Sequence, residues 1–133
     1  MMRYMLDTNI CSYVLRSRPP SVKARFDEAG PGALTVSTVV LAELLYGAAR
    51  HPSAAAIRRE IGDLVSRLDV VPWDEAAAEH YGAIRAALEK RGTPLGAMDM
   101  LVAAHARSRG ATLVSNDVRH FGRVEGLLLA NWV

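Results

Sequence analysis

The chain has 133 residues, of which half are hydrophobic and 23% are charged, and it carries 16 Lys and Arg against 14 Asp and Glu. This length fits a single domain over residues 1–133, and the composition excludes an intrinsically disordered protein. A net charge of +2 does not by itself indicate a nucleic-acid-binding protein.

The single cysteine, Cys11, excludes a disulfide within the chain and a zinc site built from cysteines. The N-terminal residues do not form a signal-peptide core, and no apolar run approaches the ~18 residues that a membrane span needs. We therefore expect a protein of the reducing cytoplasm without membrane contacts.

Hydrophobic periodicity and chain-breaking residues predict alternating strands and helices. In chain order the predicted elements are a strand at 4–7, helices at 10–16 and 21–29, a strand at 33–37, helices at 38–50 and 54–68, a strand at 69–72, helices at 75–91 and 100–109, a strand at 111–115 and a strand near 127–129. This alternation indicates an α/β fold with a mostly parallel central sheet of four to five strands, covered by helices on both faces.

Capping residues place several helix ends. Ser21 is expected to cap the second helix, which Gly30-Pro31-Gly32 ends. Asp74 is expected to cap the helix at 75–91, and Gly92 to close it. The residues of that helix expected to face inward are Ala78, Tyr81, Ile84 and Leu88. Together with the preceding helix, it is a candidate surface for self-association or for a partner.

Four acidic residues are expected to converge at one edge of this sheet. Asp7 and Asp117 each follow an apolar strand, and the carboxyl ends of parallel strands share an edge where ligands bind. Glu43 lies early in the helix after the second strand. Asp99 begins the helix that leads to the fourth strand, and it reaches the same edge if the loop at 91–98 carries the chain back.

Each acid also has a simpler interpretation. Asp7 is a good cap for the helix that follows it. Glu43 is equally consistent with a position on the solvent-facing side of its helix. His105 is expected to be a packed helix residue, and Cys11 a small buried one without a base to activate it. The sequence has no glycine-rich phosphate-binding motif of the GxxxxGKS kind.

Carboxylates held this close repel one another unless some are protonated or a cation joins them. An all-oxygen site favours Mg²⁺ or Mn²⁺ over zinc, with Asp7 and Asp99 as the expected metal ligands, and it suits phosphodiester hydrolysis. The residues expected to orient the ligands are Thr8, Asn9, Ser115 and Asn116. The arginines expected to hold RNA phosphates are Arg107, Arg109, Arg119 and Arg123.

Four short motifs lie in register along the chain: MLDTN at 5–9, STVVLAELLYGA at 37–48, GTPLGAMDMLVAAHA at 92–106 and LVSNDVRHF at 113–121. Together they resemble the PIN-domain ribonucleases, and more narrowly the VapC toxins of type II VapBC toxin–antitoxin pairs. The resemblance runs from Met5 to Trp132. It is greatest to the subgroup that cuts the anticodon loop of initiator tRNA.

The resemblance implies a three-layer α/β/α fold and Mg²⁺-dependent RNA cleavage. It implies that Asp7, Glu43 and Asp99 form the acidic core, with Asp117 as the fourth acid. It also implies a homodimer that a VapB-type antitoxin neutralises by covering the acidic pocket, in a complex that represses its own operon. Two features depart from the family pattern: members often carry Asn at the position of Asp117, and Ala97-Met98 replaces a Pro followed by a polar or aromatic residue.

Three other functions are weighed against a tRNA-cleaving toxin. The same fold can act on ribosomal or messenger RNA. A signalling receiver module also has acids at its sheet ends, but it relies on a late Lys, and no Lys follows Lys90. A catalytically silent interaction module would not need all four acids.

Overall fold

The computed structural model describes residues 3–30 and 32–133. Its centre is a five-stranded sheet with the strand order β3-β2-β1-β4-β5, in which every pairing is parallel. The strands are β1 (Tyr4–Leu6), β2 (Leu34–Ser37), β3 (Asp69–Val71), β4 (Thr112–Val114) and β5 (Leu128–Ala130). The α/β fold with a parallel sheet is therefore confirmed.

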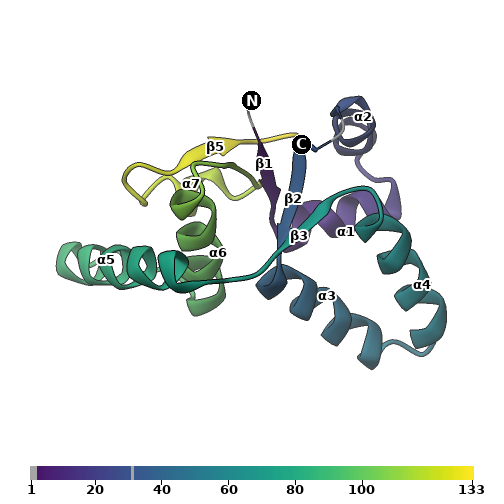
Figure 1. Ribbon diagram of the computed structural model, residues 1–133, viewed down its shortest axis with the longest axis horizontal. Coiled ribbons are helices and arrows are strands. Elements are labelled where there is room, and N and C mark those ends of the chain that lie inside the picture. Colours follow the sequence, from purple (N-terminus) through teal and green to yellow (C-terminus); the bar gives the residue numbers. More distant parts are fainter. Residues whose placement is uncertain (1–2, 31) are drawn as a thin grey trace.

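Helices cover both sides of this sheet (Figure 1). They are α1 (Thr8–Arg16), α2 (Pro20–Glu28), α3 (Thr38–Arg50), α4 (Ala54–Val65), α5 (Glu75–Arg91), α6 (Ala97–Ser108) and α7 (Val118–Phe121). In Figure 1, α5, α6 and α7 lie to the left of β1 and β2, and α1, α2 and α4 lie to the right. This is the expected three-layer α/β/α arrangement.

The central strand β1 and its neighbour β4 are buried on both faces. Met5 and Leu6 of β1 pair with Leu113 and Val114 of β4, and all four side chains have no exposed surface. Helices cover both faces of a parallel sheet, so these strands are continuously apolar rather than alternating. A polar residue directly after such a strand is therefore held at a fixed edge of the core.

Several predicted helix ends were wrong by a few residues. Ser21 does not cap α2, because Pro19 is the N-cap and Pro20 takes the first helical position, where its missing N–H is not needed. The helix α6 begins at Ala97 rather than at 100, so Asp99 lies within its first turn. Pro31, predicted to help end α2, lies outside the described residues.

The helix α5 has the predicted ends and most of the predicted inward face, since Ile84 and Leu88 are buried and Tyr81 is half-buried. Asp74 Oδ1 accepts a hydrogen bond from Ala77 N, and Gly92 ends the helix with φ at 69°. Ala77 is buried and Ala78 is exposed, contrary to the prediction. The helix packs against α6, and α4 packs against α3, so α4 and α5 form no joint surface.

The helix α7 was not predicted. Asp117 caps it by accepting a hydrogen bond from His120 N at 3.4 Å. Cys11 is buried with a free thiol, as expected. In the described part of the chain, no helix is both long and apolar enough to cross a membrane.

Candidate functional site

Three of the predicted acids line one cavity of about 160 Å³. Asp7 directly follows β1, Glu43 comes from the second turn of α3, and Asp99 comes from the first turn of α6. The complete lining is Asp7, Thr8, Asn9, Glu43, Asp99, Val102 and Phe121. The parallel sheet thus gathers carboxylates that are far apart in the sequence, and we refer to this hollow as the acidic cavity.

Asp7 both caps a helix and lines the cavity. Its side chain is only 7% exposed, and its Oδ1 accepts a hydrogen bond from Ile10 N at 2.9 Å. Burial raises the pKa of Asp7 above its ordinary value, and the charges of Asp99 and Asp117 raise it further. Hydrogen bonds from the Ser115 hydroxyl and from Ile10 N oppose this rise in the pKa.

Glu43 is held in place by the first residue of α1. Thr8 Oγ1 donates a hydrogen bond of 2.6 Å to Glu43 Oε1, and both side chains are half-buried. The two residues are 35 positions apart, so this bond joins α1 to α3 at the cavity wall. Asn9 lines the same cavity and is exposed to solvent.

Asp99 lies in a field of negative charge. Burial raises its pKa most, followed by the charges of Asp117 and Glu43, while His120 opposes the rise. The carboxylates of the cavity therefore destabilise one another's charged forms, which is the electrostatic condition that a bound cation would relieve.

Asp117 does not line the acidic cavity, unlike the other three acids. Its Oδ1 lies 2.7 Å from His120 Nδ1, and this hydrogen bond is the main reason that the pKa of Asp117 falls below its ordinary value. Its charge nevertheless raises the pKa values of Asp7 and Asp99, so it lies near the rim. His120 was missed by the sequence analysis, although the Asp-x-x-His spacing within one helical turn is a signal for it.

The two polar residues before Asp117 have different surroundings. Ser115 is fully buried, its hydroxyl opposes the rise in the pKa of Asp7, and it accepts a hydrogen bond from Asp117 N at 2.9 Å. Asn116 is exposed, and its Nδ2 donates to the Tyr13 hydroxyl at 3.1 Å. Of these two residues, only Ser115 therefore lies against the acids as the sequence analysis expected, whereas Thr8 does so at Glu43.

The donor set fits a hard cation that keeps part of its water shell. Within residues 3–30 and 32–133, no three acidic, histidine or cysteine side chains are arranged to hold one metal ion together. Zinc needs such a group, whereas Mg²⁺ retains several waters and is bound through one or two carboxylates. Asp7 and Asp99 supply oxygen atoms of this kind in the same cavity.

The predicted arginines are not one group. Arg107 and Arg123 line a small cavity of about 50 Å³ together with Arg91, which the sequence analysis missed. Arg109 ends α6, and Arg119 is exposed on α7. Arg91 donates to the Arg123 carbonyl, Arg107 to the Glu125 carbonyl and Arg123 to the Pro94 carbonyl. Among the described residues, the three cavity arginines form no ion pair.

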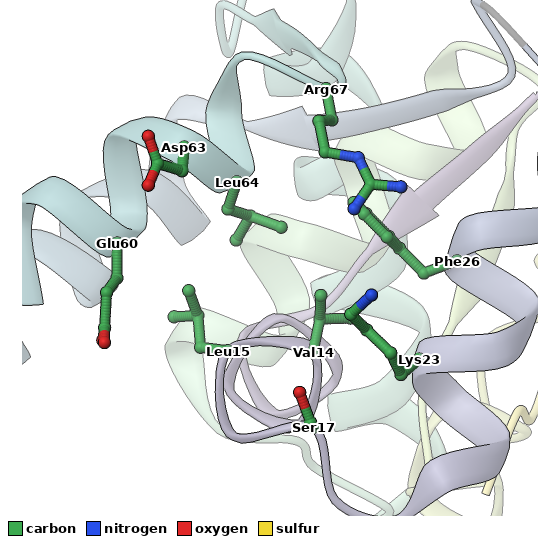
Figure 2. A pocket seen from close by; sticks show the side chains of 9 residues that line it. All are labelled: Val14, Leu15, Ser17, Lys23, Phe26, Glu60, Asp63, Leu64 and Arg67. Carbon is green, nitrogen blue, oxygen red and sulfur yellow. The ribbon is translucent and has the colours of Figure 1, made fainter.

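A separate groove of about 240 Å³ lies between α1, α2 and α4 (Figure 2). Its floor is apolar, and Figure 2 shows Val14, Leu15, Phe26 and Leu64 converging on it. Its charged lining residues are Lys23, Glu60, Asp63 and Arg67. The groove shares no lining residue with the acidic cavity, and no pattern in the sequence had indicated it.

Sequence comparison gives one family and several relatives. Residues 4–127 match the PIN domain. The chain is 44% identical to the tRNA(fMet)-specific endonuclease VapC of Shigella flexneri, with 99% of each chain covered. It is 43% identical to Ribonuclease VapC2 of Haemophilus influenzae strain Rd, with both chains covered completely.

Comparison with solved structures gives the same result. The chain is similar to the DNA-bound VapBC of Salmonella typhimurium, with a TM-score of 0.93, 36% identity and complete coverage of both chains. It is also similar to VapBC2 of Rickettsia felis bound to a promoter fragment, with a TM-score of 0.90 and 33% identity over 99% of this chain and all of that one.

Proposed function

The chain belongs to the PIN-domain family and, within it, to the VapC toxin ribonucleases, and we propose that it is a Mg²⁺-dependent endonuclease of initiator tRNA. The observation that carries this proposal is the acidic cavity, in which Asp7, Glu43 and Asp99 meet at the edge of the sheet. The family relationship adds the class of reaction, hydrolysis of a phosphodiester bond in RNA.

In this proposal Asp7 and Asp99 hold the metal ion. A bound Mg²⁺ supplies Lewis-acid stabilisation of the phosphate and a more acidic water as the nucleophile. Thr8 fixes the carboxylate of Glu43, and the backbone N–H of Ile10 fixes that of Asp7, so both acids are oriented before substrate arrives. Asn9 lines the same cavity and is exposed to solvent, so it is the proposed contact for the entering phosphate.

Asp117 has a lesser role in this proposal. Its carboxylate already has a partner in His120 and lies outside the cavity lining, so it contributes negative charge at the rim rather than a ligand. The departure from the Asn common at this position therefore has little consequence for catalysis.

Two relatives support tRNA as the substrate. The proteins of Shigella flexneri and Salmonella typhimurium are both tRNA(fMet)-specific endonucleases, at 44% and 36% identity. The anticodon loop of initiator tRNA is accordingly the proposed cleavage site, and arrest of translation is the proposed consequence. Ribosomal and messenger RNA are the alternative substrates.

Arg91, Arg107 and Arg123 are the proposed phosphate contacts. Backbone carbonyls hold each guanidinium in place without neutralising it, which leaves a fixed positive charge. The charge of Arg123 lowers the pKa of Asp117, so this group begins near the acid rim. Arg109 and Arg119 lie apart from it and are less suited to the same path.

The proposed partner is a VapB-type antitoxin. The similar structures from Salmonella typhimurium and Rickettsia felis are VapBC complexes bound to DNA. We expect a homodimer in the cytoplasm, whose acidic cavity is covered by the antitoxin tail and which contacts operator DNA only through the antitoxin. The apolar groove between α1, α2 and α4 is a suitable surface for an apolar segment of that antitoxin.

The test is cleavage of purified initiator tRNA beside an elongator tRNA and a ribosomal RNA fragment, each with Mg²⁺ and with a chelator. We expect one cut in the initiator anticodon loop that depends on Mg²⁺ and is lost in Asp7→Asn. Cleavage that persists in Asp7→Asn, or that proceeds in the chelator, would contradict the proposed mechanism. Preference for the ribosomal fragment would support the alternative substrate.

A further inference from the structure

We propose that Trp73 and His105 are positioning residues that fix α3 against α6 and thereby set the spacing of the Glu43 and Asp99 carboxylates. The inference rests on the proposed function, because it concerns the same acidic cavity. Neither residue lines that cavity, and neither is expected to touch RNA.

Trp73 bridges the two helices from the loop after β3. Its backbone N–H donates to Thr38 Oγ1 at 3.1 Å, and Thr38 is the first residue of α3. Its indole Nε1–H donates to the Leu101 carbonyl of α6 at 2.9 Å. One residue thus connects the beginning of α3 to α6, and Tyr81 of α5 packs edge-on against its ring.

His105 makes a second connection between the same helices. Its Nδ1 lies 2.8 Å from Ser37 Oγ, and both side chains are fully buried. Ser37 is also the N-cap of α3, since its hydroxyl oxygen accepts from Val39 N. A hydrogen bond in so dry a place is costly to break, because the freed polar atoms cannot reach water.

The two connections are close to each other on both helices. Ser37 and Thr38 are adjacent, and Leu101 and His105 are one helical turn apart, so the contacts fix both the distance and the rotation of α6 relative to α3. No other side-chain hydrogen bond links these two helices within the described residues.

The acids lie a short way along the same helices. Asp99 is two residues before Leu101, and Glu43 is five residues after Thr38. Both carboxylates line the acidic cavity, so the space between them depends on how α3 and α6 pack. Misplacement of a reacting group by about 1 Å costs on the order of 100-fold in rate, so a modest slip of α6 is sufficient to impair cleavage.

The chain offers a matched control in its other tryptophan. Trp132 is 3% exposed and packs edge-on against Tyr4, with ring centroids 5.3 Å apart. Its indole N–H has no hydrogen-bond partner in the described structure. Trp132→Phe therefore reduces a packed indole to a smaller ring, as Trp73→Phe does, without removing a bond between α3 and α6.

The experiment compares Trp73→Phe with Trp132→Phe in kcat, KM and melting temperature. We expect Trp73→Phe to lower kcat about 10-fold with KM nearly unchanged, and Trp132→Phe to keep kcat within about twofold at a similar loss of melting temperature. Equal losses of kcat in the two variants, or a loss confined to KM, would overturn the inference.

His105 is tested by a conservative rescue. His105→Asn retains a hydrogen-bonding nitrogen near the position of Nδ1, whereas His105→Leu retains only volume. At matched folded fractions, the Asn variant is expected to keep kcat within about threefold and the Leu variant to lose about 10-fold. If the two variants are equally active, the Ser37 contact does not position the acids.

If the wild-type protein cleaves no RNA, that result refutes the proposed function but leaves the positioning role open. The positioning role is then tested by crystal structures of the variants. Crystal structures of Trp73→Phe and Trp132→Phe should show α6 displaced against α3 by more than about 0.5 Å in the first variant only, which exceeds the tolerance of a functional site. Unmoved helices in Trp73→Phe would refute the positioning role.

Discussion

At the scale of single residues, Asp7 combines a structural and a chemical task. As the N-cap of α1 it satisfies Ile10 N, which is the usual work of an Asp at this position. As a cavity residue it is almost fully buried near Asp99 and Asp117, and its pKa is raised. The capping bond requires only a hydrogen-bond acceptor at this position. The negative charge that Asp7 brings to the cavity lowers the stability of the folded protein, because the carboxylate is buried.

Replacing Asp7 by Asn should separate the two tasks, because the amide still accepts the capping bond. A raised carboxyl pKa means that the folded state binds the proton more tightly than the unfolded chain, where Asp7 titrates near 3.8. The free energy of unfolding therefore decreases as the pH rises from 3.8 through the folded-state pKa, and stays reduced at higher pH.

We thus expect Asp7→Asn to melt a few degrees above the wild type at pH 7 without metal, with the difference shrinking as the pH falls toward 4. The same variant should lose cleavage by about 100-fold or more. Thermal melts across this pH range are the measurement. A variant that melts below the wild type at pH 7 would show that the charge stabilises the fold.

Asp99 and Asp117 should differ sharply under the same substitution. Asp99 lines the cavity, whereas Asp117 is at the rim with His120 as its partner. Asp99→Asn is expected to reduce kcat about 100-fold and Asp117→Asn less than 10-fold. Single-turnover cleavage of initiator tRNA measures both, and equal losses would place Asp117 among the ligands.

At the scale of elements, α5 shows how local sequence fixes a helix. Asp74 begins it, and Gly92 ends it in the left-handed conformation, with φ at 69°. The same helix contains Gly82, which is exposed and has open space where a Cβ would lie. Gly92 therefore stabilises the end of this helix, whereas Gly82 lowers the stability of its interior.

Alanine at these two positions should change stability in opposite directions. Gly92→Ala places a Cβ in a left-handed conformation and should destabilise the protein by about 1 kcal/mol. Gly82→Ala improves the helix propensity and should stabilise it by about 0.5–1 kcal/mol. Urea unfolding measures both. A stabilised Gly92→Ala would mean that the helix end has a different conformation in solution.

At the scale of the whole molecule, the net charge of +2 matters less than where the cations lie. Arg91, Arg107 and Arg123 are gathered beside the acid rim without carboxylate partners among the described residues. In the proposed function these fixed guanidinium groups are the phosphate contacts, and they would let a polyanion approach an acidic site that otherwise repels it.

Binding of tRNA to the inactive Asp7→Asn protein should weaken steeply with salt. Each phosphate contact adds about 0.9 to the slope of log affinity against log salt, so Arg91→Gln and Arg107→Gln should each reduce that slope by about 1. Arg58→Gln, on the exposed face of α4, is the control and should leave it unchanged. Equal slopes in all three variants would remove these arginines from the RNA path.

The sequence by itself determined the alternation of strands and helices, the parallel sheet and the cavity formed by Asp7, Glu43 and Asp99. These features depend on periodicity and capping, which are local, and on the rule that parallel strands end at one edge. The predicted start of α6 was wrong by three residues, but the prediction that Asp99 lies at this edge was still right. The reason is that a shift of a few residues leaves Asp99 at the same end of the helix.

Only the tertiary structure decided which distant side chains meet. It paired Asn116 with Tyr13, and Trp73 with two helices at once. It also placed α4 and α5 on opposite sides of the sheet, where the sequence had suggested one surface. Such contacts depend on how whole elements pack across the sheet, and no local pattern of residues encodes that packing.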